Sequence, residues 1–355
     1  MVNLDDPNTY TRLDPQGMGS LIPEMGQQLR DAACLVSAFG HPGPEFSAAR
    51  NVVILGMGGS AIGGDLVRTL VDDQARVPIA VCRDYRVPAF VGPDSLVIAS
   101  SYSGGTEETL SATQEAIDRG AKVMAVTTGG KLEAMLQKHG LPVLEFQYKA
   151  QPRAALGYSF GLLLGLLSEL GYFDESQLGL DEAVATAESA PFSLGSGVPE
   201  SSNPAKQLAR RLHGKLPVVY GGGILSEVAR RWKGQFNENS KAWAFFEQLP
   251  EANHNAAVGY ENPSDLAANL HVILLTASAY HPRTAARVRI TAEILRQRAV
   301  GHEVVEARGN SPLGQMIDSI LTGDYTSYYL AALYETDPTP VKVIDFLKGQ
   351  LAAIK

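Results

Sequence analysis

The sequence predicts a doubly wound α/β fold, in which helices cover both faces of parallel sheets. Short apolar runs such as VVILGM and SLVIASS alternate with segments long enough for helices, starting near residue 52. Runs of this kind are typical of strands that are buried on both faces of a parallel sheet. The same alternation begins again at LPVVYGGG, which indicates a second sheet in the second half of the chain.

Each half supplies its own set of expected elements. The first half begins with a helical segment before residue 45 and continues with strands at VVILGM, PIAVC, SLVIASS, AKVMAVTT and LPVLEF. The pattern PRAALGYSFGLLLGLLSELGYF predicts one long helix that closes this half. The second half has strand candidates at LPVVYGGG, AWAFFEQ, HVILLTA and HEVVEAR, and its clearest helix pattern is RTAARVRITAEILRQRA.

The composition between the halves predicts the domain organisation. The stretch ESAPFSLGSGVPESSNP is rich in Ser, Pro and Gly, which is typical of a linker. We therefore expect an N-terminal domain over residues 1–175, a linker over 176–203 and a C-terminal domain over 204–355. Both halves contain a strand that ends in glycines and is followed by a helix, which suggests a duplication.

Charge and cysteine content exclude several classes of partner. The chain has a net charge of -8, and its basic residues form no stripe, so neither nucleic acid nor an anionic membrane surface is expected to bind it. Cys34 and Cys82 are too few for a disulfide framework, which favours a reducing cytoplasm. The start MVNLDDPNTY is acidic and no apolar span has membrane length, so we expect neither export nor membrane insertion.

A glycine-rich loop follows the first expected strand. The stretch ILGMGGSAIGG opens a helix, where backbone N–H groups and the positive helix end can receive an anion. The spacing is neither the dinucleotide pattern G-x-G-x-x-G nor the Gly-Lys-Ser/Thr of a nucleotide phosphate loop, so a nucleotide is not favoured. A tight turn without a ligand is the alternative interpretation of this loop alone.

A second loop, SSYSGGTEET, follows another expected strand and carries several hydroxyl groups. Ligands of doubly wound sheets bind at the carboxyl ends of strands near a switch in strand order, so the two loops are expected to share one pocket. A helix cap explains one hydroxyl but not three and a second loop. We expect a phosphate to be held by neutral donors from Gly58, Gly59, Ser60, Ser101, Ser103 and Thr106.

Two further motifs contain groups that can move protons. In GQFNENSKAW, Glu238 lies between two asparagines at the expected end of a helix, where neighbouring amides could orient its carboxylate. A solvated glutamate at a helix end is the alternative. In PEANHNAAVG, His254 lies in an expected turn between two asparagines, which is a reasonable position for a proton-transfer group.

The combination of these motifs resembles a known family. GMGGSAIGGD and SYSGGTEET resemble the two phosphate-holding loops of the sugar isomerase (SIS) domain, a flavodoxin-like fold that binds phosphosugars. NENSK, LPEANHN and DPTPVKVIDFLK are similar to segments of the bifunctional phosphoglucose/phosphomannose isomerase family, whose members have two SIS domains. The resemblance therefore implies two flavodoxin-like SIS domains with parallel sheets flanked by helices.

The resemblance also implies a role for four side chains. It makes Glu238 the base that moves a proton between sugar carbons C1 and C2, and His254 the group that assists ring opening. In the superfamily this histidine comes from the neighbouring subunit, which implies a homodimer with composite sites. Lys348 resembles the lysine that contacts ring or enediol oxygens, with Lys342 as the alternative, and Arg153 resembles the arginine that stabilises the enediolate.

The local sequence supports further predictions at some of these positions, and one position departs from the family pattern. Arg153 is expected at the start of the long helix, where the dipole disfavours a cation, so a bound anion is its most economical partner. A lysine on a terminal helix is usually solvated, and Thr339 in DPTP is a weaker candidate. The family loop often reads Ser-Gly-Asn-Thr, and Gly105 at the Asn position removes one side-chain donor.

The implied activity is aldose–ketose isomerisation. A phosphorylated hexose, glucose 6-phosphate or mannose 6-phosphate, would be interconverted with fructose 6-phosphate through a cis-enediol, with no cofactor. The seven histidines show no metal-ligand spacing, so no metal is expected. The alternatives are another SIS-domain phosphosugar enzyme and a non-catalytic phosphosugar regulator, although such regulators usually add a helix-turn-helix and a basic face.

Overall fold

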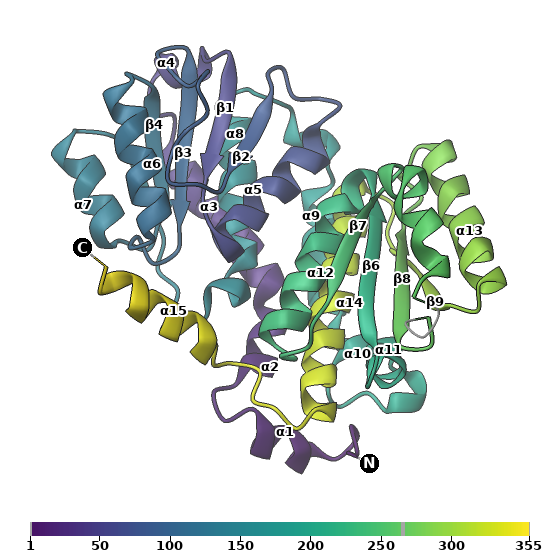
Figure 1. Ribbon diagram of the computed structural model, residues 1–355. Helices are drawn as coiled ribbons and strands as arrows, with labels where there is room; N and C mark the ends of the chain where they lie inside the picture. The colour runs from purple at the N-terminus through teal and green to yellow at the C-terminus, as the bar shows by residue number, and fades with distance from the viewer. Residues whose placement is uncertain (1, 264–266, 355) are drawn as a thin grey trace.

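The structure of the protein is a computed structural model that describes residues 2–263 and 267–354. Two parallel sheets, each accompanied by helices, form its framework (Figure 1). The α/β class is therefore confirmed, and all nine predicted strands are present. Among the described residues, no helix combines the length and the apolar character that crossing a membrane requires.

The first sheet has the strand order β2-β1-β3-β4-β5. Its strands are β1 (Asn51–Leu55), β2 (Ile79–Cys82), β3 (Ser95–Ser101), β4 (Lys122–Thr127) and β5 (Val143–Glu145). All residues of β3 are buried, as its almost uninterrupted apolar sequence predicts for a central parallel strand. Because β1 lies between β2 and β3, the strand order switches here, and the loops after β1 and β3 emerge side by side.

Helices cover both faces of this sheet. They are α3 (Met25–Phe39), α5 (Gly58–Val71), α6 (Glu107–Asp118), α7 (Gly130–Lys138) and α8 (Leu156–Glu169). Val52 and Ile54 of β1 belong to the core that includes α3, α5 and α8. Val53 and Leu55 instead pack with residues of α6 on the other face. The alternation along one strand therefore supplies two apolar layers.

The second sheet has the strand order β7-β6-β8-β9. Its strands are β6 (Leu216–Gly222), β7 (Phe245–Leu249), β8 (Leu270–Thr276) and β9 (Gly301–Glu306), and helices α11 (Pro204–Leu212), α12 (Ser226–Glu238) and α13 (Pro282–Gln297) accompany them. The first strand of each sheet lies between the second and the third. The two sheets thus share the order of their first four strands, as a duplication would produce.

A long helix, α14 (Pro312–Leu333), was not among the predicted elements. It is buried from Leu313 to Leu333. It packs against α9 (Leu180–Ser189), α11 and α12. This helix therefore forms much of the interior of the second half, although its sequence includes several polar side chains.

The predicted linker at residues 176–203 is largely helical. It contains α9, α10 (Pro191–Leu194) and η4 (Glu200–Ser202), and η3 (Glu175–Gln177) overlaps its start. Helix α9 packs against α3 on one side and α14 on the other. The segment is therefore a packed bridge between the halves and not an extended linker, while the boundaries at residues 175 and 204 stay a prediction.

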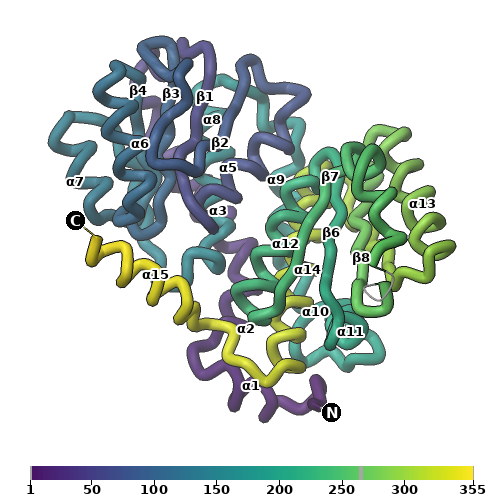
Figure 2. The backbone as a smooth tube through the Cα atoms, in the orientation of Figure 1, coloured from purple at the N-terminus to yellow at the C-terminus, as the bar shows by residue number. Residues whose placement is uncertain are grey.

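Both ends of the chain are helical, but the C-terminal helix is fully exposed. The N-terminal segment is helical, as predicted, with α1 (Pro7–Leu13), α2 (Met18–Leu21), η1 (Ile22–Glu24), α3 and α4 (Pro44–Ser47). The C-terminal helix α15 (Lys342–Ala352) buries none of its residues. Its apolar side chains Val343, Phe346 and Leu347 are exposed. In Figures 1 and 2, α15 extends away from α14 as an arm that ends at the C-terminus.

Candidate active site

The two predicted phosphate loops lie side by side and are joined by a hydrogen bond. The Oγ atom of Ser60, in the first turn of α5, accepts a hydrogen bond from the backbone N–H of Tyr102 at 3.0 Å. Gly58 begins α5 with φ at +50°. The first N–H groups of a helix have no carbonyl partner within it, so those of Gly58 and Gly59 are suited to an anion. The structure therefore brings the glycine loop and the hydroxyl loop to one place.

The hydroxyl groups of the second loop are close to the start of α6. Ser101 Oγ donates to Thr106 Oγ1 at 3.3 Å, and the N–H of Gly105 donates to Ser103 Oγ at 3.3 Å. Thr106 occupies the N-cap position of α6, but its side chain makes no capping hydrogen bond. The hydroxyls and the helix N-terminus thus gather in one loop without a cation among the residues that form it.

The two glycines of this loop have different surroundings. Gly104 has φ at +59°, and a Cβ atom there would lie 1.7 Å from the carbonyl oxygen of Gly129. Only glycine fits this position. At Gly105 the nearest atoms to an added Cβ, both in Ser103, are 3.9 Å away. The departure from the family pattern at Gly105 therefore removes a side chain from a position that has room for one.

Arg153 is buried and connects the two halves of the chain. Its Nε donates to Asn239 Oδ1 at 2.7 Å, and its Nη2 donates to the carbonyl oxygens of Pro338 and Thr339, each at 2.7 Å. Its Nη1 lies 3.4 Å from Oε2 of Glu238. Burial lowers the pKa of the Arg153 guanidinium, and the nearby Glu238 carboxylate opposes that shift.

The position of Arg153 differs in one respect from the prediction. It lies in the short 3-10 helix η2 (Pro152–Ala154), before α8, and not in the long helix itself. Its hydrogen-bond partners among the described residues are protein oxygens, and the bound anion that the sequence suggested stays a prediction. These acceptors offset the cost of burying the guanidinium, while Nη1, which has two N–H groups, makes a single contact within the described part of the chain, at 3.4 Å with Glu238.

The glycine loop packs closely against the backbone of the segment that carries Arg153. A Cβ atom added to Gly59 would lie 3.0 Å from the carbonyl oxygen of Pro152. Ser159 of α8 donates its hydroxyl to the carbonyl oxygen of Gly59 at 3.2 Å. The glycine loop, the Arg153 segment and Glu238 therefore form one continuous group of contacts across the two halves.

Glu238 is the last residue of α12, as predicted, and about one third of its side chain is exposed. The neighbouring amides do not bind its carboxylate directly. Asn237 Nδ2 donates to the carbonyl oxygen of Ala242, and Asn239 accepts from Arg153 and donates to Ser327 Oγ. The asparagines thus orient Glu238 indirectly, by fixing the helix end and the arginine beside it.

The buried ion pair between Arg231 and Asp324 contacts the backbone of Arg153. Arg231 Nη2 donates to the carbonyl oxygen of Arg153 at 2.9 Å and to Asp324 Oδ2 at 2.8 Å. Gln235 Nε2 donates to the other oxygen of Asp324 at 2.9 Å. Burial raises the pKa of Asp324, and Arg231 opposes this shift. Both oxygens of Asp324 are thus paired, and Arg231 Nη2 holds the backbone of Arg153, whereas the buried Nε of Arg231 has no hydrogen-bond partner among the described residues.

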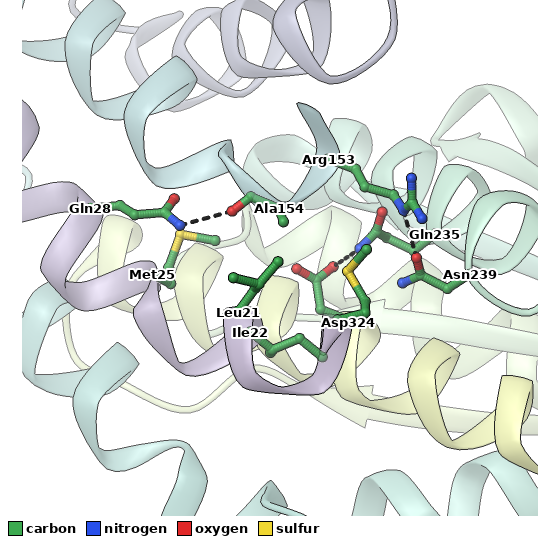
Figure 3. Close-up of a pocket in the computed structure, with 10 residues that line it drawn as sticks. Leu21, Ile22, Met25, Gln28, Arg153, Ala154, Gln235, Asn239 and Asp324 are labelled. Atoms are coloured by element: carbon green, nitrogen blue, oxygen red, sulfur yellow. Dashed lines mark hydrogen bonds between the residues drawn. The ribbon is translucent and has the colours of Figure 1, made fainter. Parts of the chain in front are cut away.

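Helix α3 holds the same segment from the other side (Figure 3). Gln28 Nε2 donates to the carbonyl oxygen of Ala154 at 2.8 Å, while Gln28 Oε1 accepts from the N–H of Gly157 at 2.9 Å. Figure 3 shows Gln28 and Asp324 on opposite sides of a small cavity below Arg153. The segment that carries the arginine is therefore fixed by helices from both halves.

His254 and Glu238 lie at opposite ends of β7. Helix α12 starts after the carboxyl end of β6 and runs back along β6 and β7, so Glu238 lies near the amino end of β7. His254 ends η6 (Glu251–His254), which follows the carboxyl end of β7, and its side chain is exposed. Five strand residues span about 16 Å. The structure therefore does not bring this histidine to the glutamate of its own chain.

The structure places the two candidate lysines on α15, where Lys342 and Lys348 are exposed. Within the described residues, neither lysine forms an ion pair with Glu238, whose cationic partner is Arg153. Thr339, in the segment that leads to α15, is buried, and its Oγ1 has no hydrogen-bond partner among the described residues. Over residues 2–263 and 267–354, no three His, Cys, Asp or Glu side chains are placed to hold a metal ion.

Comparison with known proteins assigns this arrangement to a family. The family model described as "Bacterial phospho-glucose isomerase C-terminal SIS domain" matches residues 201–351. The chain is also 47% identical over 305 residues to the bifunctional phosphoglucose/phosphomannose isomerase of Caldicellulosiruptor bescii, covering 86% of this chain and 90% of that protein. The chain belongs to the bifunctional phosphoglucose/phosphomannose isomerase family.

Other comparisons agree with this phosphoglucose/phosphomannose isomerase assignment. The protein of the same name from Aquifex aeolicus is 37% identical, over 85% of this chain and 90% of its own length. The crystal structure of a hypothetical protein from Thermus thermophilus superposes with a TM-score of 0.74 at 16% identity, covering 98% of this chain and 92% of that one. The latter similarity supports the fold alone.

Several residues of this phosphoglucose/phosphomannose isomerase site escaped the sequence analysis. Asn239 stands in the quoted motif NENSK, but its contact with Arg153 depends on a segment far away in the sequence. Gln28, Arg231 and Asp324 lie on helices and gave no local signal. Polar residues within apolar helix sequence are the one indication that could have pointed to them, because buried polar groups need partners.

Proposed function

We propose that this chain is an aldose–ketose isomerase that interconverts glucose 6-phosphate and mannose 6-phosphate with fructose 6-phosphate. The observation that carries the proposal is the position of Arg153, which contacts the Glu238 carboxylate and lies in the segment that packs on the phosphate loop. The loop proposed to bind the phosphate and the base proposed to act on the sugar carbons thus belong to one connected site. Membership of the isomerase family supports the same activity.

The phosphate would bind where the two loops meet. Backbone N–H groups of Gly58 and Gly59 and the hydroxyls of Ser60, Ser101, Ser103 and Thr106 supply neutral donors. Two helix N-termini, those of α5 and α6, add positive potential at the same place. This arrangement explains how a protein with a net charge of -8 can hold a dianion.

The proposed chemistry is a proton transfer by Glu238. The carboxylate takes the proton from C2 of the open-chain aldose, which leaves a cis-enediol, and the proton returns to C1 to give the ketose. Arg153 Nη1, 3.4 Å from Glu238, places a positive charge beside the negative charge that develops on the enediolate oxygens. Glucose and mannose 6-phosphates differ only at C2, which is planar in the enediol, so one base serves both without a metal.

The ring-opening group is proposed to come from a second copy of the chain. His254 lies beyond the far end of β7 from Glu238 in its own chain, whereas it is exposed and available to a neighbour. A two-fold dimer places equivalent residues of the two chains in reciprocal positions and would create two composite sites. We propose such a homodimer, with Lys348, or Lys342 in its place, as the lysine that contacts sugar oxygens.

The activity can be tested directly with the purified protein. Fructose 6-phosphate is supplied, and glucose 6-phosphate formation is followed with glucose-6-phosphate dehydrogenase; a mannose 6-phosphate assay is run in parallel. We expect turnover of both epimers in a cytoplasmic enzyme of this class. Phosphosugar binding without turnover would favour the regulator, and turnover of a different phosphosugar alone would favour another SIS-domain enzyme.

A further inference from the structure

Lys241 belongs to the motif NENSK but has no part in the function proposed above. It follows Glu238 by three residues, and its side chain folds back toward the end of α12. Its Nζ donates to the carbonyl oxygen of Glu238 at 2.6 Å and to that of Pro338 at 3.0 Å. One ammonium group therefore joins the residue that carries the proposed base to the segment before α15.

The backbone of Lys241 is unusual for a lysine. Its φ is +52°, in the left-handed region that favours glycine at the ends of helices. The turn is closed by a hydrogen bond from the N–H of Ala242 to the carbonyl oxygen of Phe236 at 3.1 Å. Glycine would adopt this φ with less strain. The lysine side chain therefore has a role beyond the turn, which is the pair of hydrogen bonds to the carbonyl oxygens of Glu238 and Pro338.

Lys241 and Arg153 share one acceptor. Arg153 Nη2 donates to the same Pro338 carbonyl oxygen at 2.7 Å, and its Nη1 lies 3.4 Å from the Glu238 carboxylate. The two cations come from distant parts of the chain, and together they bind the backbone and the side chain of Glu238. Among the described residues, loss of Lys241 leaves the helix end linked to Pro338 through Arg153, which contacts Asn239 at 2.7 Å and Glu238 at 3.4 Å.

The charged groups that face Lys241 are Arg153, Glu238 and Asp337. Partial burial, followed by the charge of Arg153, lowers the pKa of Lys241 to about 8, and the two carboxylates oppose that shift. The ammonium is therefore charged near neutral pH and loses its proton in mildly alkaline solution. Its contribution to the site changes over that pH range.

We propose that Lys241 is a positioning residue of the isomerase, whose ammonium fixes the end of α12 against Pro338 so that the Glu238 carboxylate stays aligned with Arg153 and the sugar. The inference rests on the proposed function, because it takes Glu238 as the base. Lys241 is expected to affect kcat and not phosphate binding, because it contacts the end of α12 that carries the base.

The test compares the wild type with Lys241→Met and Lys241→Arg, and measures kcat and KM for fructose 6-phosphate across the pH range around 8. Lys241→Met is expected to lower kcat about 10- to 100-fold near neutral pH with little change in KM, as misplacement of a reacting group does. Lys241→Arg should keep a charge above pH 8, so the alkaline decline of kcat should move upward. Lys215→Met is the matched control, because within residues 2–263 and 267–354 Lys215 Nζ donates to a backbone carbonyl, that of Ala268 at 2.7 Å, far from Glu238 in the sequence.

The outcomes separate this inference from the proposed function. An inactive wild type would overturn the proposed function itself. An active wild type with unchanged kcat in Lys241→Met, or with the same alkaline decline in Lys241→Arg, would overturn the role of Lys241. Binding of sorbitol 6-phosphate by calorimetry checks that each variant is folded, and an equal loss of binding and kcat in Lys241→Met would also count against positioning.

Discussion

The guanidinium group of Arg153 lies 3.4 Å from the carboxylate of Glu238, although 85 residues separate the two in the sequence. This contact joins the half of the chain that holds the phosphate loops to the half that supplies the proposed base. Arg231 and Gln28 hold the arginine segment from two sides, so the contact depends on helices from both halves. The proposed chemistry is therefore a property of the assembled pair of domains.

Glu238→Gln should lower kcat by about 10²- to 10⁴-fold, because the variant removes the proposed proton acceptor. The amide has nearly the same size, so binding of fructose 6-phosphate should be kept. Steady-state kinetics and calorimetry measure the two effects. Glu335→Gln, which changes an exposed carboxylate paired with Arg12, is the control and should have wild-type kinetics. Equal loss of turnover and binding in Glu238→Gln would indicate a structural role.

Mixing Glu238→Gln protein with His254→Ala protein should restore activity if the histidine serves the partner subunit. In a mixed dimer, one of the two sites combines an intact glutamate with an intact histidine. At equal amounts and full exchange, about a quarter of all sites recover. The assay follows fructose 6-phosphate turnover over time after mixing. No recovery, with exchange shown by native mass spectrometry, would place both groups in one chain.

Ser103→Ala should raise KM for fructose 6-phosphate about tenfold to hundredfold with little change in kcat. The expected loss corresponds to one hydrogen bond to a charged phosphate, about 1.5 to 3 kcal/mol. Ser111→Ala, on the exposed side of α6, is the control. An unchanged KM in Ser103→Ala would move the phosphate to another place.

Chelation of metals should leave both isomerisations unchanged. The glucose and mannose reactions pass through the same enediol, and the proposed base for both is Glu238. Rates with glucose 6-phosphate and mannose 6-phosphate are measured after exhaustive dialysis against EDTA, and again after Zn²⁺ is added back. Selective loss of the mannose reaction would contradict a shared site without a metal.

The stability of the wild type relative to Lys241→Met should rise with pH between about 8 and 10.5. Lys241 has a pKa of about 8 in the folded protein, below its ordinary value of 10.5. Between these values the unfolded chain binds more protons, so deprotonation favours folding. Thermal unfolding of both proteins at several pH values gives the difference. A difference that stays constant over this range would contradict the lowered pKa, and Lys241→Arg provides a non-titrating comparison.

The strands were predictable because each contains a short apolar run, which is a signal in the local sequence. Helix α14 was not, because it is buried on all sides and carries Gln315, Asp318 and Asp324 among apolar residues, so no single polar face marks it. A helix enclosed by α9, α11 and α12 lacks the amphipathic period on which recognition depends. The helices within the predicted linker were missed for a related reason, since α9 is held in place by packing on two distant helices, α3 and α14.

The loops of the site were predictable because glycines and hydroxyls at strand ends carry a local signal. The surroundings of Arg153 were not, because its partners Asn239, Pro338 and Thr339 come from two other segments. Dipole reasoning at a helix start favoured an external anion for this arginine and could not indicate the protein acceptors that tertiary contacts supply. Sequence thus indicated which groups are present and could not indicate how far Glu238 lies from His254.

With the proposed homodimer, the separation of Glu238 and His254 along β7 would make activity depend on protein concentration. If the proton-transfer groups at its two ends must be matched across a dimer, an isolated chain would keep its fold and its phosphate loops but lack a complete site. Dilution below the dissociation constant of the dimer would then abolish activity without unfolding the protein. Activity would fall more steeply than in proportion to the protein concentration. A substrate that bridges both chains would in turn favour assembly, so the sugar phosphate itself would help to switch on the enzyme that consumes it.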